Sequence, residues 1–173
     1  MTIGYRKPPH YTADADARES KNDYKEIIIK PKGLNIVWGN DSRYWRLPEL
    51  DSDPVELVQV SWLEVTGSAK LRKNKTYEIS FKVSLKDDAF GWSSCPVFLM
   101  AKLSKKGKYI WKRINQIEAD QGGQFEIPKD DKFQVTVPDE DDKTELFFGL
   151  YEVWSGKWKG GLKIHEVLIK RVD

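Results

Sequence analysis

Strict alternation of apolar and polar residues marks the segment between Thr76 and Leu85. Its apolar positions are Tyr77, Ile79, Phe81, Val83 and Leu85. Because side chains of a strand point alternately to opposite faces, this period of two predicts a strand with one buried and one solvated face. A shorter alternation over residues 133–137 predicts another strand, which Pro138 ends.

Further apolar runs are separated by Gly, Pro, Asn and Asp, which favour turns. These runs cover residues 25–30, 34–38, 55–65, 97–103, 109–111, 145–154 and 162–172. Run 55–65 is apolar on both faces, so we expect it in the middle of a sheet. About eight to ten short strands without an amphipathic helical period predict an all-β fold, a two-layer antiparallel β-sandwich of the jelly-roll kind.

The composition is that of a globular domain. The chain has 173 residues, of which 39% are hydrophobic, 32% charged and 12% aromatic. This length can bury a core without disulfides, and aromatic side chains suit a pleated sheet. No apolar run approaches the roughly 20 residues that span a bilayer, so we expect no membrane partner. The net charge of +2 gives no long-range attraction for phosphate, so we expect no nucleic acid partner.

Residues 1–24 are rich in charge and lack an apolar period, so we expect an arm that is flexible or laid along the surface, followed by one domain over residues 25–173. The arm lacks the apolar segment of a secretory signal. Cys95 is the single cysteine, which fits a reducing compartment but leaves open a bridge to another chain. We therefore predict a cytoplasmic protein, in which the glycosylation sequons at Asn40 and Asn74 stay bare.

Side chains for metal binding or nucleophilic catalysis are scarce. His10 and His165 are the only histidines, and with one cysteine they cannot form a zinc site of the usual composition. Ser93 and Ser94 lie in no nucleophile-elbow pattern. We therefore expect neither a metal nor a cofactor.

Glu145 and Glu152 lie seven residues apart in one predicted strand. The odd spacing puts them on opposite faces, so they cannot flank one glycosidic bond unless a bulge intervenes. Glu152 continues the apolar row of Leu146, Phe148 and Leu150. A carboxylate in such a row requires either a ligand or a salt bridge to a neighbouring lysine.

Two tryptophans, Trp38 and Trp45, flank the polar turn Gly39-Asn40-Asp41. Trp45 and Trp158 have charged neighbours, so we expect both to contact a ligand, although core packing is the ordinary use of an indole. Trp62 is expected in the core. An indole can cover the apolar face of a pyranose while polar groups bind its hydroxyls, so the turn predicts a sugar site.

A series of short motifs follows in order along the chain. They are Leu34–Asp41, Arg43–Trp45, Glu56-Leu57, Val60–Gly67, Leu71, Thr76-Tyr77, Gly91, Cys95–Val97 and Trp158–Leu162. In order and spacing they resemble the plant phloem lectins (phloem protein two) and the related Nictaba-type lectins, over roughly residues 28–172. The short loops look most like the small cucurbit phloem lectins. One departure is Leu47, where many members have a second tryptophan.

The resemblance implies a jelly-roll lectin for chitin-type oligomers of N-acetylglucosamine and, in some members, the glycan cores of glycoproteins. It also implies a non-enzymatic, commonly dimeric protein of the cytoplasm or phloem sap. The basic run 105–108 is a weak nuclear-import signal. Sugar-binding tryptophans of the family fall at Trp38 and Trp45, and acidic site residues fall at Glu145 and Glu152. The full expected carbohydrate-binding set is Trp38, Asn40, Tyr44, Trp45, Glu145, Glu152, Trp158 and Lys159.

We therefore interpret residues 25–173 as a carbohydrate-binding lectin domain without a catalytic step. A homodimer with two sites would raise avidity by ~10²–10⁴ on a multivalent glycan. Two other functions stay open. One is a protein-interaction sandwich whose aromatic residues form a partner interface, and the other is a small glycosidase that uses Glu145 and Glu152.

Overall fold

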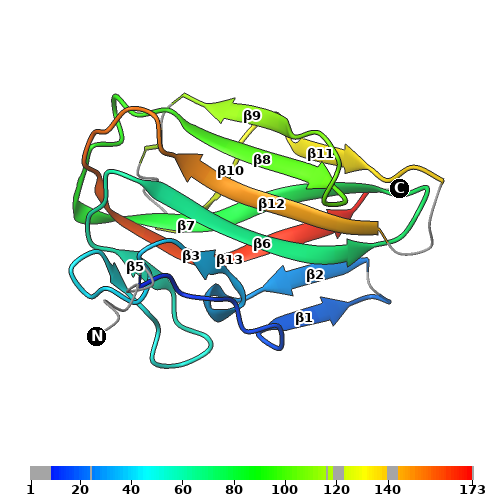
Figure 1. The fold of residues 1–173 in the computed structure, drawn as a ribbon, viewed down its shortest axis with the longest axis horizontal. Coiled ribbons are helices and arrows are strands. Elements are labelled where there is room, and N and C mark those ends of the chain that lie inside the picture. The colour runs from blue at the N-terminus through cyan, green and yellow to red at the C-terminus, as the bar shows by residue number, and fades with distance from the viewer. Residues whose placement is uncertain (1–8, 24, 116, 119–122, 140–143, 173) are drawn as a thin grey trace, which may run out of the picture.

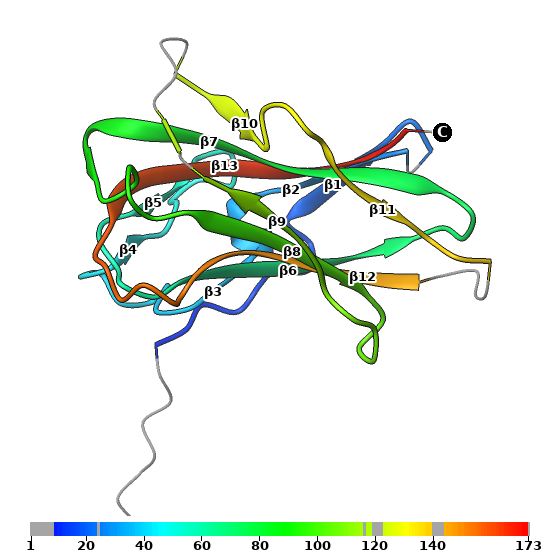
Figure 2. The same cartoon turned by 90° about the horizontal axis from the view of Figure 1, so that it is seen from above.

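The computed structural model describes residues 9–23, 25–115, 117–118, 123–139 and 144–172. These residues form thirteen strands and one short 3-10 turn, η1 (Pro31–Gly33). The strands make two antiparallel sheets that pack as layers (Figure 1 and Figure 2). The predicted all-β, two-layer antiparallel sandwich is confirmed. Within the described ranges, no helix has the length and apolar character needed to cross a membrane.

One layer is an eight-stranded sheet built on the long antiparallel pair β7 (Thr76–Phe90) and β13 (Gly160–Arg171). Its other strands are β1 (Arg18–Lys21), β2 (Glu26–Ile29), β4 (Trp45–Arg46), β5 (Val55–Leu57), β10 (Phe125–Ile127) and β11 (Phe133–Thr136). The pairing of β7 with β13 shifts register beside Gly161, whose φ is +84°. Glycine adopts this conformation without steric cost, so Gly161 lets β13 bulge where the strand begins.

The second layer is a five-stranded sheet in the order β3-β6-β12-β8-β9. Its strands are β3 (Asn35–Ile36), β6 (Leu63–Leu71), β12 (Thr144–Glu152), β8 (Val97–Leu103) and β9 (Ile110–Ile114). Figure 2 shows the two layers from above, with β7 and β13 in one and β6, β8 and β12 in the other.

The core lies between the two sheets, and the alternating strands supply it. On β7 the predicted apolar row is buried as far as Val83, and the strand continues to Phe90, beyond the predicted end at Leu85. Phe81 of β7 and Phe148 of β12 meet across the core, with ring centres 6.1 Å apart and planes at 73°. Such an edge-to-face contact is a favoured aromatic geometry, so it ties the two layers together.

The prediction of one central strand over residues 55–65 is wrong. Its first part, β5, belongs to the eight-stranded sheet, and its last residues open β6 in the other sheet. The chain crosses from one layer to the other over residues 58–62. Each half faces the shared core from its own side, which is why the sequence looked apolar on both faces.

The described part of the predicted arm lies along the sandwich. Tyr11 forms two backbone hydrogen bonds with Ile36, each 2.9 Å long, and β1 pairs with β2. Residues 1–8 and 24 lie outside the described ranges. Cys95 is buried with a free thiol, so a bridge to another chain would require the sandwich to open there.

Candidate functional site

Three segments meet at one end of the sandwich around a groove of about 270 Å³. They are the turn after β3, the crossing segment 58–62 and the loop that joins β12 to β13, at the left end of the molecule in Figure 1. The groove is lined by Trp38, Tyr44, Val60, Ser61, Trp62 and Trp158. Aromatic rings therefore form most of its wall.

Tyr44 lies in the middle of this aromatic wall. Its ring centre is 6.4 Å from that of Trp158, with the planes 31° apart, and 5.9 Å from that of Trp38, with the planes 64° apart. Trp158 is 51% exposed and Trp62 is 47% exposed, whereas Trp38 and Tyr44 are half-buried. Tilted and edge-on contacts fix the rings against one another, so the groove offers flat apolar surface at set angles.

Asp41 stabilises the turn that carries Trp38. The Asp41 N–H donates to the Trp38 carbonyl (3.0 Å), and the Asp41 carboxylate accepts from the backbone and guanidinium of Arg43 at 2.7–3.0 Å. The hydrogen bonds from Arg43 lower the pKa of the Asp41 carboxyl. Trp38 has a φ of +65°, a left-handed conformation that costs a side chain of this size about 1–3 kcal/mol. The turn therefore holds the indole in a strained position.

The arm closes the outer side of the same turn. His10 Nδ1 accepts the Trp38 N–H at 2.9 Å, and the two rings meet edge to face at 5.5 Å. Asn40 donates through its side-chain amide to the His10 carbonyl (3.0 Å) and through its N–H to the Pro9 carbonyl (2.8 Å). Asn40, an expected sugar ligand, thus binds the arm, and His10 is a positioning residue that sequence reasoning missed.

A buried lysine supports the groove from below. Lys159 is fully buried, and its Nζ lies 2.8 Å from Glu152 Oε1. The same ammonium donates to the carbonyls of Ser61 and Lys157, each at 2.9 Å. Its three protons thus reach the crossing segment, the loop after β12 and β12 itself. Lys159, an expected sugar ligand, instead fastens the two rims of the groove together.

Glu152 completes this buried ion pair. Its carboxylate accepts from the Ser155 hydroxyl and from the N–H groups of Trp154 (3.2 Å) and Ser155 (3.3 Å). Burial by itself raises the pKa of the Glu152 carboxyl, but the hydrogen bonds and charge of Lys159 and Ser155 outweigh it, so the pKa is lowered. Of the two roles left open for Glu152, the structure shows the salt bridge to a lysine.

Backbone contacts bring the crossing segment and the β12–β13 loop together. Val60 and Lys159 form a bridge of two hydrogen bonds, 2.9 and 3.0 Å long. A Cβ on Gly160 would collide with the Val58 carbonyl oxygen, so only glycine allows this approach. Trp92 donates its indole N–H to the Gly160 carbonyl at 2.9 Å from the buried side.

The prediction that Trp45 contacts a ligand is wrong, because its side chain is only 1% exposed. Trp45 lies opposite Leu57 in the β4–β5 pair and faces the core, whereas its neighbour Arg46 forms a 3.1 Å salt bridge with Glu56. Consecutive strand residues point to opposite faces, so a charged neighbour is no sign of an exposed tryptophan. Leu47 packs partly buried against the core.

The prediction that Trp62 belongs to the core is also wrong. The inward row of β6 begins at Leu63, so Trp62 is out of phase and points outward. Its indole N–H donates to Glu64 Oε1 at 3.1 Å. The alternation from Leu63 onward was the signal that could have placed Trp62 at the surface.

Glu145 lies outside the groove, near the other end of β12, where it lines a different hollow beside Arg18. Seven residues at about 3.3 Å each separate it from Glu152 by roughly 23 Å. A glycosidase pair requires carboxylates about 5–9.5 Å apart, so these two cannot act on one glycosidic bond.

No group of three or more His, Cys, Asp or Glu that could hold a metal occurs in the described ranges. His165 lies on β13, away from the groove, and shares a 2.7 Å hydrogen bond with the Ser84 hydroxyl. Burial, followed by the charges of Lys163 and Lys82, lowers the pKa of His165. The groove thus offers aromatic surface and polar rims held by a buried ion pair.

Comparisons with known proteins extend this picture. Residues 24–171 match the family described as Phloem protein 2. The chain is 47% identical over 182 residues to Protein PHLOEM PROTEIN 2-LIKE A9 of Arabidopsis thaliana. This alignment covers 96% of this chain and 98% of that protein. It is 32% identical to PHLOEM PROTEIN 2-LIKE A1 of the same plant, over 83% of this chain and 61% of that protein. A protein named Lectin from Luffa acutangula is 33% identical over 74 residues, which cover 38% of this chain and 35% of that protein.

Proposed function

This chain belongs to the phloem protein 2 family, and from that premise we propose that it is a carbohydrate-binding lectin without a catalytic step. The observation that supports this function is the groove whose wall is made by Trp38, Tyr44 and Trp158. A pyranose has an apolar C–H face and a ring of hydroxyls, which suits a mostly apolar site with a few placed polar groups.

In this proposal the exposed ring of Trp158 covers the sugar face, and Tyr44 and Trp38 shape the wall beside it. Ser61 lines the same groove and supplies a hydroxyl for the sugar. Glu152 and Lys159 make no contact with the sugar, since their polar atoms bond to one another and to the chain. They hold the rims so that little ordering is required on binding, which reduces the entropic cost of association.

For the sugar itself we propose short oligomers of N-acetylglucosamine, with N-glycan cores as a related ligand. The acetamido group offers a methyl for an aromatic ring and an amide for a polar partner. A groove with four aromatic side chains and one serine has both kinds of group. We further propose that the protein works in the cytoplasm.

Calorimetric titration with chitotriose tests the site. Trp158→Ala and Tyr44→Ala should each weaken binding by about tenfold or more, as loss of a central aromatic contact does. Trp111→Ala is the matched control, because Trp111 is 62% exposed and lies outside the groove. Cellotriose, which has the same ring but no acetamido group, should bind more weakly than chitotriose.

Wild-type affinity in both groove variants would refute the assignment of this groove. If chitotriose gives no heat with the wild-type protein, the N-acetylglucosamine specificity is wrong. Incubation with chitotetraose should yield no shorter products, because the Glu152 carboxylate beneath the groove is tied to Lys159. Shorter products would instead indicate a glycosidase.

A cluster of exposed rings favours a second function in protein contacts. The Phe98 ring centre lies 5.7 Å from that of Trp111 and 5.0 Å from that of Trp154, and both tryptophans are more than 60% exposed. We propose that a second copy of the chain covers these rings in a homodimer. Light scattering should then give a dimer for the wild type and a monomer for Trp111→Ala; chitotriose, being monovalent, should bind both equally.

A further inference from the structure

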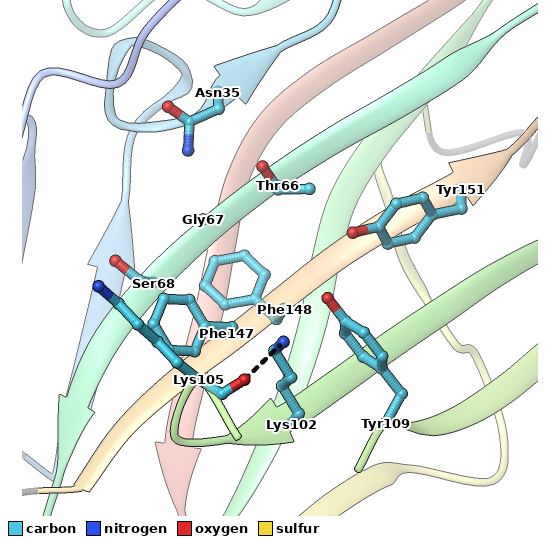
Figure 3. A pocket seen from close by; sticks show the side chains of 10 residues that line it. All are labelled: Asn35, Thr66, Gly67, Ser68, Lys102, Lys105, Tyr109, Phe147, Phe148 and Tyr151. Atoms are coloured by element: carbon cyan, nitrogen blue, oxygen red, sulfur yellow. Dashed lines mark hydrogen bonds between the residues drawn. The ribbon is translucent and has the colours of Figure 1, made fainter. Parts of the chain in front are cut away.

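The outer face of the five-stranded sheet carries a second hollow, with a volume of about 250 Å³. Figure 3 shows that its side chains come from β3, β6, β8, β12 and the turn between β8 and β9. None of its lining residues lines the groove at the end of the sandwich. The two sites can therefore be altered separately.

Gly149 is a close neighbour of residues that line this hollow. It lies between Thr66 and Met100 on the neighbouring strands, in the outward row of β12 that also carries Phe147 and Tyr151. A Cβ at Gly149 would lie 2.6 Å from Cε2 of Tyr151 and 3.0 Å from Cγ2 of Thr66. The missing side chain lets the Tyr151 ring lie across the sheet, and the hollow remains open beside the ring.

Two lysines of the β8–β9 region supply positive charge. Lys102 Nζ donates to the Lys105 carbonyl at 3.2 Å and lies 4.7 Å from the ring centre of Tyr109 and 5.9 Å from that of Phe147. These rings hold the ammonium at the edge of the hollow by cation–π attraction. Lys105 lines the hollow as well, and no carboxylate is among the described residues that line it. The hollow is therefore cationic.

The opposite wall is polar and uncharged. It is formed by Asn35, Thr66 and Ser68. The Asn35 Oδ1 accepts the N–H of Ala13 at 2.9 Å, which fixes the amide and turns its nitrogen toward the hollow, as Figure 3 shows. An amide, two hydroxyls, two ammonium groups and aromatic rings thus line one hollow, and in Figure 3 the Lys105 side chain extends toward Ser68.

We propose that this hollow binds a carboxylate-bearing saccharide, a short uronate oligomer. Phe147 and Tyr151 offer surface for a pyranose face, and the wall of Asn35, Thr66 and Ser68 bonds its hydroxyls. The ammonium groups of Lys102 and Lys105 pair with its carboxylates. A neutral sugar would leave both lysines without use, and a small inorganic anion would leave the aromatic floor without use.

The basic hairpin extends this match beyond the hollow. Lys106 and Lys108 follow Lys105 in the same exposed turn, so positive charge continues past one end of the site. A linear uronate carries one negative charge on every sugar ring. The second and third rings of an oligomer therefore meet further cations when the first ring occupies the hollow.

Titration of the full chain with trigalacturonate tests this proposal, and the methyl-esterified trisaccharide is the matched neutral ligand. The acid should bind at least about tenfold tighter than the ester, the range expected for a charge-assisted hydrogen bond. Raising the ionic strength should lower the affinity for the acid and leave the affinity for the ester unchanged, because salt screens surface charge. Equal affinity for acid and ester would overturn the proposal.

Variants locate the site. A double variant, Lys102→Met and Lys105→Met, keeps an apolar stem beside Tyr109 and Phe147 at position 102 and should reduce trigalacturonate affinity about tenfold or more. Lys170→Met, which changes an exposed lysine on β13 in the other sheet, should alter trigalacturonate affinity less than twofold. In NMR titrations the amide signals of Thr66 and Gly149 should shift. An unchanged affinity in the double variant, or an equal loss with Lys170→Met, would overturn the assignment.

The end groove serves as an independent reference. Tyr44→Ala removes part of the aromatic wall there. This variant should bind trigalacturonate as the wild type does and should bind chitotriose more weakly. The lysine double variant should show the reverse pattern. Loss of trigalacturonate binding in Tyr44→Ala would mean that the acid enters the end groove, and the second site would be rejected whether or not chitotriose binds.

Discussion

Replacing Lys159 with methionine tests whether the buried ion pair holds the groove together. Methionine keeps most of the apolar stem and removes the ammonium that bonds to Glu152, Ser61 and Lys157. The Glu152 carboxylate then keeps only its contacts with Ser155 and the Trp154 N–H. The variant thus leaves a carboxylate only 2% exposed without a counter-ion.

The expected cost is large because a buried charge loses its partner. Removing one member of a buried pair destabilises proteins by about 3–5 kcal/mol. For a chain of this size, each kcal/mol lowers the melting temperature by about 2–4 °C, so Lys159→Met should melt about 6–20 °C lower than the wild type. The carbonyls of Ser61 and Lys157 also lose a donor, so the two rims of the groove should separate and chitotriose affinity should fall.

Urea unfolding followed by tryptophan fluorescence measures this cost. Lys157→Met is the matched control, because its side chain is exposed and should change stability by less than about 0.5 kcal/mol. Adding Glu152→Gln to Lys159→Met removes the unpaired charge, so the double variant should be more stable than Lys159→Met alone. A Lys159→Met cost below about 1 kcal/mol, or a double variant less stable than the single one, would refute the ion-pair argument.

Three further outcomes follow from buried or clamped side chains. Trp45→Ala should destabilise the fold by about 3–5 kcal/mol in urea unfolding, as loss of a core tryptophan does, whereas Trp45→Phe should cost far less. His10→Ala should weaken chitotriose binding in calorimetry because Trp38 loses its clamp, with thermal stability nearly unchanged. The lowered pKa of His165 favours the neutral imidazole in the folded state, so the free energy of unfolding should fall as pH drops below about 6.5. His165→Gln should flatten that part of the pH–stability curve, and an unchanged slope would contradict the reasoning.

The regular strands were predictable because their signal is local. The period of two on β7 and the apolar run that became β8 depend only on which residues face the core. The short strands β1, β4 and β10 could not be found in this way, since two to four residues carry no measurable period. They form because β2, β5 and β7 offer them an edge to pair with.

The site was predicted in part, and its errors have one physical origin. Trp38, Tyr44 and Trp158 do meet at the groove. Trp45, which was expected to contact a ligand, lies in the core, whereas Trp62, which was expected in the core, lines the groove. Exposure was inferred from the polarity of neighbours along the chain, whereas a strand sends neighbours to opposite faces. The contact of His10 with Trp38 joins positions 28 residues apart, and no local pattern encodes it.

The course of β13 determines how this protein can be displayed on a surface. The strand begins beside the groove at Gly160 and ends at Arg171, at the far end of the sandwich in Figure 1. Molecules tethered through this last strand would turn the groove toward the solution. A tether through the segment at His10 would instead crowd the groove, so the two orientations should differ in the amount of glycan that they capture.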